Sequence, residues 1–214
     1  MNSVVNITRS TLAYNIAGSG WGGAVGTFSD VFIQDSTFEH NEATTYGGDL
    51  LVSGGAHVEV VRTVFKGARA ATYGGSISAE GGGSSTRLTD STFLDTQAAE
   101  YAGLSRVDVA SRVEFVRCFI STITSPASVF QVEDADSSLS IVDSIIHNIT
   151  SGTVIIDDSS GAAFAVQLDT VHFHSNARPA LVSCARGTEA GRQVGAAKCA
   201  HQQPRERQRG QRRK

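Results

Sequence analysis

Acidic residues gather in two short segments of this 214-residue sequence, and their side chains are the ones best suited to acid–base or cation-binding chemistry. The first segment is "VEDAD", with Glu133, Asp134 and Asp136, and the second is "IIDDSSG", with Asp157 and Asp158. Carboxylates that act as acid and base, or that bind calcium, usually have an Arg or Lys nearby. No basic or histidine partner is expected at a matching position. We therefore predict solvated turn carboxylates and no catalytic residue.

Histidine and cysteine give no pattern typical of a metal centre or of a disulfide framework. The three cysteines, Cys118, Cys184 and Cys199, are far apart and cannot all pair within one chain. The six histidines, His172 and His174 among them, are not expected to share a position in the sequence pattern. The sequence thus predicts no metal site and no other cofactor.

Aromatic residues stand ahead of several glycines, and these could form a binding surface. They are Trp21, Tyr46, Tyr73 and Tyr101. Each follows a large hydrophobic residue by eight or nine positions, so in a stacked structure they would form a ladder along one edge. An exposed ladder could bind sugar rings or a partner's apolar side chains. In the alternative interpretation the stacked rings only stabilise consecutive coils.

An internal repeat predicts the elements that position these residues. Large hydrophobic anchors recur every 26 to 28 residues, and alternating hydrophobic residues precede most of them, which predicts a strand with one buried face. The anchors are Leu12, Phe38, Phe65, Phe93, Ile120, Ile146 and Phe173. Short strands, bends and no helical pattern predict an all-β, right-handed parallel β-helix of about seven coils over residues 1–184. A leucine-rich repeat has a similar period, but its asparagine-and-leucine consensus is missing.

Positions around each anchor predict how a coil turns. Asn15 and Asn41, three places after their anchors, are expected at a bend with left-handed backbone. The glycine pairs that follow are expected at a tight corner with positive φ. Three places before the anchors, the charge alternates in sign, which predicts a structural ladder of ion pairs. This column consists of Arg9, Asp35, Arg62, Asp90, Arg117 and Asp143.

Two tetrapeptides carry a resemblance to a known family. The segments "GGAV" (22–25), "GGDL" (47–50) and "GGSI" (74–77) occur with "LAYN" (12–15), "FEHN" (38–41) and "FHSN" (173–176). They resemble the GGA[ILV] and FxxN repeats of the polymorphic outer-membrane protein family. The resemblance implies a right-handed parallel β-helix with the pectin-lyase-like fold. It also implies a surface or secreted protein, because the bacterial members are autotransporter adhesins.

Composition separates a body from a tail. The 22 glycines and only three prolines favour stacked strands, and no apolar run of 18 residues encodes a membrane span. Residues 185–214 hold nine of the 18 Lys and Arg but only two of the 21 Asp and Glu. This Arg/Gln-rich tail is predicted to be disordered, and a role in nucleic-acid binding is the less favoured alternative.

These observations lead us to expect a non-catalytic scaffold or adhesion module that binds glycans or proteins along one face. The alternative is a polysaccharide-active β-helix lyase or hydrolase, for which Asp157 and Asp158 are the candidate carboxylates. The first coil begins within five residues of Met1 without a segment that could cap it. We therefore expect the chain to be a piece of a longer extracellular or cell-surface repeat protein, with neighbouring repeats as partners.

Overall fold

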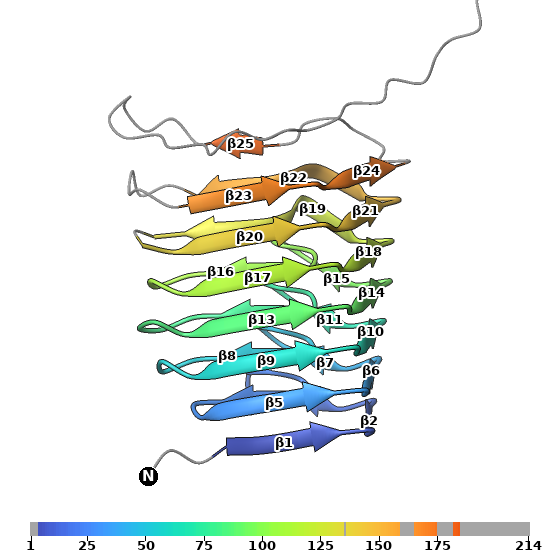
Figure 1. Cartoon of the computed structure of the whole chain (residues 1–214), viewed down its shortest axis with the longest axis vertical. Coiled ribbons are helices and arrows are strands. Elements are labelled where there is room, and N and C mark those ends of the chain that lie inside the picture. The colour runs from blue at the N-terminus through green and yellow to red at the C-terminus, as the bar shows by residue number, and fades with distance from the viewer. Residues whose placement is uncertain (1–3, 135, 159–164, 175–181, 185–214) are drawn as a thin grey trace, which may run out of the picture.

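The computed structural model describes residues 4–134, 136–158, 165–174 and 182–184. These residues form a parallel β-solenoid of about six turns without a helix, which confirms the predicted all-β repeat architecture. Figure 1 shows the turns stacked along one axis, from β1 at one end to β23 near the other. No helix that could cross a membrane occurs in this part of the chain. The predicted basic tail, residues 185–214, lies outside the described residues.

Two sides of every turn are seven-stranded parallel sheets. The first sheet consists of β1 (Val4–Thr8), β5 (Asp30–Gln34), β9 (His57–Val61), β13 (Ser85–Thr89), β17 (Arg112–Val116), β20 (Ser138–Val142) and β23 (Ala165–Asp169). The second sheet consists of β2 (Thr11–Ala13), β6 (Thr37–Glu39), β10 (Val64–Lys66), β14 (Thr92–Leu94), β18 (Phe119–Ser121), β21 (Ile145–His147) and β24 (His172–His174). Each strand pairs with the strands one repeat before and after it, so equivalent residues stack in columns.

The third side is a longer, interrupted sheet. It contains β3 (Ile16–Ala17), β4 (Val25–Thr27), β7 (Glu42–Ala43), β8 (Leu50–Val52), β11 (Arg69–Ala70), β12 (Ile77–Ala79), β15 (Gln97–Ala98), β16 (Ser105–Val107), β19 (Thr124–Glu133), β22 (Thr150–Asp158) and β25 (Val182–Cys184). In the first four turns two short strands occupy this side. In the next two turns, β19 and β22 each run its whole length.

Stacked anchor residues form the core. The anchors Phe38, Phe65 and Phe93 are fully buried, and their rings stack with centroid separations of 4.9 and 4.7 Å. Beside them the inward residues of the first sheet, such as Ile33 and Val60, are also fully buried. Burying apolar surface stabilises by about 25 cal/mol per Å². Because a single turn cannot bury this surface by itself, the stability of each turn depends on its neighbours.

Two corners of each turn, one on either side of the second sheet, have left-handed backbone. One position is three before the anchor, as at Arg9 and Asp35, and the other is two after it, as at Tyr14 and His40, all with φ between 48° and 57°. The prediction that Asn41 itself has left-handed backbone is therefore wrong. The chain turns one residue earlier, which points the Asn41 side chain into the interior, where it is fully buried.

Asn41 uses its amide to join two turns. Its Oδ1 accepts hydrogen bonds from the backbone N–H and the Nδ2 of Asn15 at 3.0 and 2.9 Å. Its own Nδ2 donates to the Leu12 carbonyl at 3.0 Å and to Asp49 at 2.8 Å. A buried amide is tolerated only when its donors and acceptors are paired. The FxxN position is therefore an inward hydrogen-bonding site.

The two glycines of each pair have different roles. The first, at Gly22, Gly47 and Gly74, has φ between 54° and 59°, which confirms the predicted positive φ. The second is required by close packing against the next turn. A Cβ on Gly48 would lie 2.5 Å from the Arg69 carbonyl oxygen and closer still to that of Gly75.

We predict that Gly48→Ala destabilises the solenoid by about 3 kcal/mol or more, because a backbone atom of the neighbouring turn blocks the added methyl group. Gly26→Ala is the matched control, since its Cβ would lie 3.8 Å from the nearest atom, an ordinary contact. Denaturant midpoints of the two variants test the prediction. Equal midpoints would mean that the close approach at Gly48 is not a constraint.

Candidate functional site

The predicted aromatic residues form a stacked ladder for three of the four positions. The rings of Tyr46 and Tyr73 lie 5.5 Å apart and those of Tyr73 and Tyr101 lie 5.0 Å apart, nearly parallel in both pairs. Trp21 pairs with Tyr46 through the backbone, but its ring packs against Phe28 at 6.1 Å. Because the tyrosine faces are turned toward one another, the ladder presents mainly ring edges and hydroxyl groups. The binding role of these four residues stays a prediction.

Arg106 lies against this ladder and gathers three carboxylates. Its guanidinium carbon is 4.6 Å from the Tyr73 ring centroid and 5.3 Å from that of Tyr46, within the range of cation–π attraction. Its Nη1 lies 3.3 Å from Glu80, and its Nη2 contacts Asp108 and lies 2.7 Å from Glu133. The four charged side chains are between 9% and 17% exposed. This group, the Arg106 cluster, is a largely desolvated ion network.

The expectation that Glu133 has no basic partner is therefore wrong. Glu80, Asp108 and Glu133 occupy equivalent places after β12, β16 and on β19, because Ala79 pairs with Val107 and Val107 with Val132. In the sequence Glu80 and Asp108 follow their anchors by 15 residues, but Glu133 follows its anchor by 13. The fifth turn lacks the glycine pair, and its segment from the anchor to this column is two residues shorter. Counting residues from the anchors therefore does not show that Glu133 shares a column with Glu80 and Asp108.

Burial and the ratio of one cation to three carboxylates together set the pKa shifts in the Arg106 cluster. Burial is the main reason that the pKa of Glu80 is raised, although Arg106 opposes that effect. Burial by itself would lower the pKa of Arg106, but the ion pairs with Glu133 and Asp108 raise it. The exposed Asp134 has a raised pKa because of a hydrogen bond with Asp108 and the charge of that carboxylate. The carboxylates of the cluster are paired with Arg106 and shielded from solvent.

Of the remaining predicted carboxylates, Asp134 reaches the rim of this cluster through its hydrogen bond with Asp108. Asp134 and Asp136 are exposed turn residues with φ of 63° and 66°. Asp157 and Asp158 lie on β22, where the backbone of Asp157 pairs with Val132 and Cys184. Their side chains lie outside the described part of the structure.

The expectation that histidines share no position is wrong. His147 and His174 each follow an anchor by one residue, and they pair in register on β21 and β24.

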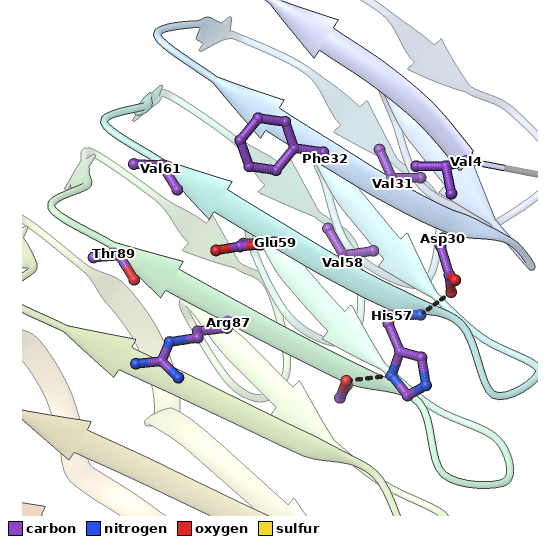
Figure 2. Close-up of a pocket in the computed structure, with 11 residues that line it drawn as sticks. Val4, Asp30, Val31, Phe32, His57, Val58, Glu59, Val61, Arg87 and Thr89 are labelled. Carbon is purple, nitrogen blue, oxygen red and sulfur yellow. Dashed lines mark hydrogen bonds between the residues drawn. The ribbon is translucent and has the colours of Figure 1, made fainter.

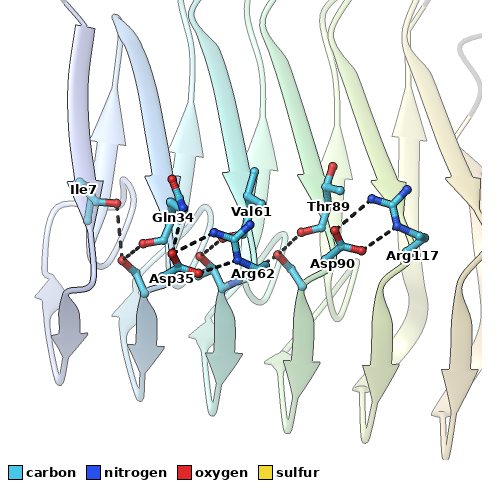
Figure 3. A network of polar contacts seen from close by, with 11 residues as sticks. Ile7, Gln34, Asp35, Val61, Arg62, Thr89, Asp90 and Arg117 are labelled. Atoms are coloured by element: carbon cyan, nitrogen blue, oxygen red, sulfur yellow. Dashed lines mark hydrogen bonds and ion pairs between the residues drawn. The ribbon is translucent and has the colours of Figure 1, made fainter.

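The alternating charge column forms the expected ion pairs at the first corner. Arg62 binds Asp35 through two hydrogen bonds of 2.7 and 2.9 Å, and Arg117 binds Asp90 at 2.7 and 3.0 Å, as Figure 3 shows. The hydrogen bonds with Arg62 and Arg117 lower the pKa of Asp35 and Asp90. All four side chains are largely exposed, and exposed pairs contribute little to stability. Their regular alternation favours correct register between turns.

Two titratable side chains, those of Cys118 and Asp49, are buried in the interior of the solenoid. Burial raises the pKa of the free Cys118 thiol to about 11, so it is not a reactive thiolate. Asp49 is fully buried at the position after the second glycine pair and accepts hydrogen bonds from Asn41 and from the Ser76 hydroxyl, each at 2.8 Å. Burial raises the pKa of Asp49 to about 7, although both hydrogen bonds oppose the shift.

An open groove on the outer face of the first sheet was not foreseen from the sequence. It crosses β1, β5, β9 and β13 and has a volume of about 640 Å³. Figure 2 shows the residues that line it. A second hollow of about 480 Å³ shares His57, Ser85 and Arg87 with it and extends along β17 and β20. The outward side chains that line the two hollows include Asp30, Phe32, His57, Glu59, Ser85, Arg87, Arg112, Glu114 and Ser138.

The groove presents paired polar groups from successive turns. Asp30 accepts a hydrogen bond from the His57 backbone N–H at 3.0 Å, and the His57 Nδ1 lies 2.7 Å from the Ser85 hydroxyl. Arg87 lies 3.6 Å from Glu114 on the next turn, and both side chains keep substantial exposure. Equivalent side chains recur at the strand spacing of about 4.8 Å. The groove is thus a periodic, mixed-charge surface parallel to the solenoid axis.

Fold and site together define a parallel β-solenoid repeat protein. It has a polar groove on its first sheet and a largely desolvated ion network at its third sheet. Comparison with family models, curated proteins and solved structures finds no match to the chain.

We predict that Arg106→Met destabilises the protein by about 3 kcal/mol or more at neutral pH, because three shielded carboxylates lose their cation. Arg62→Met, which removes an exposed ion pair, is the control and should hardly change stability. Thermal or chemical unfolding measures both. An equal, small effect of the two variants would show that the cluster is solvated and not a structural clamp.

We predict that wild-type stability decreases from pH 4 to pH 8 relative to Asp49→Asn. The folded state holds the Asp49 proton up to about pH 7, whereas the unfolded chain releases it near pH 3.8. Between these values the folded state binds more protons, so the unfolding free energy falls as pH rises. The variant should be more stable by on the order of 4 kcal/mol at pH 8 and nearly equal to wild type at pH 4. Parallel curves would contradict a buried, neutral Asp49.

Proposed function

We propose that the chain is a non-catalytic binding module that holds an extended ligand, a glycan or a protein segment, along the groove of the first sheet. The observation that carries this proposal is that two hollows with three shared residues cross six strands of the first sheet, five of which contribute outward polar side chains. A ligand that lies along the axis meets a new set of such groups about every 4.8 Å. This periodicity suits a polymer better than a compact small molecule.

Recognition in this groove must come from side chains. The strands β5 to β20 of the first sheet are paired on both sides, so their backbone groups are not available to a ligand strand. Phe32 provides a half-buried aromatic ring, while Glu59 and Arg87 offer an acceptor and donors. An aromatic platform flanked by hydrogen-bonding groups is typical of surfaces that hold sugars or polar peptides.

The resemblance of the repeats to polymorphic outer-membrane proteins supports the same proposal. It favours a surface or secreted protein, an adhesin-like role and the right-handed, pectin-lyase-like form of the β-helix. Glycans or cell-surface proteins are the partners that this role implies. The tyrosine ladder then belongs to the scaffold or to the edge of the binding face, because its rings cover one another and Arg106.

A polysaccharide-active enzyme is the second candidate, and the Arg106 cluster is the observation that favours it. Carboxylates beside a cation are what such chemistry requires. Against it, every charged side chain of the cluster is at most 17% exposed and each is paired. A substrate would have to displace these ion pairs to reach the carboxylates, which favours the binding module.

The test is retention of the chain on a panel of neutral and acidic polysaccharides, with new chain ends measured in the same samples. We expect retention without cleavage. Phe32→Ala should weaken it about tenfold, the effect of losing roughly 1.4 kcal/mol of contact. Phe119→Ala is the matched control, because Phe119 is an exposed aromatic residue of the second sheet, outside the groove.

The other outcomes are equally informative. Retention that survives both Phe32→Ala and Arg87→Ala would move the binding face away from the groove. If it were lost instead in Tyr46→Ala and Tyr73→Ala, the tyrosine ladder would be that face. New chain ends that disappear in Glu133→Gln, or when Asp157 and Asp158 become Asn, would establish the enzyme in place of the binding module.

A further inference from the structure

Carboxylates gather at the corner where the chain passes from the third sheet to the first. Three belong to the Arg106 cluster, and two more lie in the turn between β19 and β20. We call this group the acidic corner, and it consists of Glu80, Asp108, Glu133, Asp134 and Asp136. Two cations face it, since Arg106 pairs with the first three and Arg112 lines the same hollow as Asp136. Negative charge is therefore in excess at this corner.

The excess charge lies at the solvent-exposed edge of the corner. Asp134 and Asp136 are exposed, and neither forms an ion pair with another residue that the structure describes. The hydrogen bond with Asp108 and the charge of that carboxylate raise the pKa of Asp134, and Arg106 offsets this effect only in part. A second cation would be stabilised at this edge.

A buried amide beside the corner also lacks a partner. Gln131 pairs in register with Arg106 and lies on the same face of β19 as Glu133. It is only 2% exposed, and its Oε1 has no hydrogen-bond partner among the described residues. An amide oxygen accepts hydrogen bonds, as ionised carboxylates do. The corner thus favours a ligand that combines positive charge with several N–H donors, which is the chemistry of a guanidinium group.

We propose that the arginine-rich segment 205–214 of the same chain docks on the acidic corner. This segment contains a single acidic side chain, Glu206, and six cationic ones, those of Arg205, Arg207, Arg209, Arg212, Arg213 and Lys214. Residues 1–184, in contrast, hold nine Lys and Arg against nineteen Asp and Glu. Guanidinium groups bind carboxylates through paired, charge-assisted hydrogen bonds. The two parts of the chain are therefore complementary in charge and in hydrogen bonding.

The place where residues 185–214 join the solenoid brings this segment within reach. Cys184 pairs with Asp157 and Asp157 with Val132, so β25 lies two strand spacings, about 10 Å, from the residue before Glu133. Figure 1 shows β25 at the same end of the stack. Twenty residues separate Cys184 from Arg205. A flexible chain of that length spans roughly 25 Å, and attachment of this kind gives an effective concentration in the millimolar range. Ion pairs that are weak one by one can then hold the segment.

The test uses the full chain with a photoreactive benzophenone amino acid in place of Gln208. After irradiation without any glycan, mass spectrometry identifies the residues that position 208 has reached. We expect cross-links within one chain that concentrate on residues 108–112 and 133–138. Their yield should fall about fivefold or more in about 1 M NaCl, where the screening length decreases to about 3 Å. Because no glycan is present, the result does not depend on the proposed groove.

Paired variants test the acidic corner directly. Asp134→Asn combined with Asp136→Asn should lower the yield about fivefold. Both positions have left-handed backbone, which asparagine tolerates, so the turn is retained. Asp95→Asn combined with Asp143→Asn is the matched control, because these residues are also exposed and left-handed but lie at other corners. The control should leave the yield unchanged.

Arg207→Gln combined with Arg209→Gln tests the docking segment and should lower the yield as the Asp134 and Asp136 variant does. Circular dichroism confirms that every variant is folded. An unchanged yield in the Asp134 and Asp136 variant, or cross-links spread evenly over the solenoid, would overturn the proposal. Cross-links that join two chains and increase with protein concentration would also overturn it and assign the acidic corner to a second copy.

Discussion

Backbone hydrogen bonding between equivalent residues of successive turns is the interaction on which the rest of this structure depends. Every strand pairs in parallel with the strand one repeat away, so the register of one turn fixes that of the next. Hydrophobic anchors then stack on anchors, and small residues on small residues. Each column of the sequence repeat becomes a line on the surface or in the core. A surface site in such a protein is therefore built from equivalent residues of several turns and not from a single loop.

The polar interior shows how strictly this register must hold. Asn41 joins Asn15 on one side and Asp49 within its own turn, and Asp49 in turn holds Ser76 of the next. A slip would leave buried amide and carboxyl groups without partners, which costs more than their hydrogen bonds contribute. The interior network therefore selects one register. The same network contains the buried carboxyl of Asp49, whose pKa is raised to about 7 by burial.

The outer faces use the same periodicity for different purposes. At the first corner, charges of opposite sign alternate in exposed pairs, while the Arg106 cluster gathers unequal charges behind the tyrosine ladder. The groove of the first sheet stays open and mixed in charge. The groove lies on the first sheet and the Arg106 cluster at the third, so one scaffold presents different surfaces on its different sides.

The sequence by itself determined the repeat length, the parallel β architecture, the anchors of the core and the exposed charge ladder, because a periodic pattern of burial survives in one dimension. It could not reveal that Arg106 meets Glu133, since the fifth turn lacks the glycine pair and reaches this column two residues sooner after its anchor. The inward turn of Asn41 depends on which residue adopts left-handed backbone. The groove depends on which face remains uncovered. The tertiary structure was needed for these three features, because each depends on contacts between neighbouring turns that the repeat pattern does not encode.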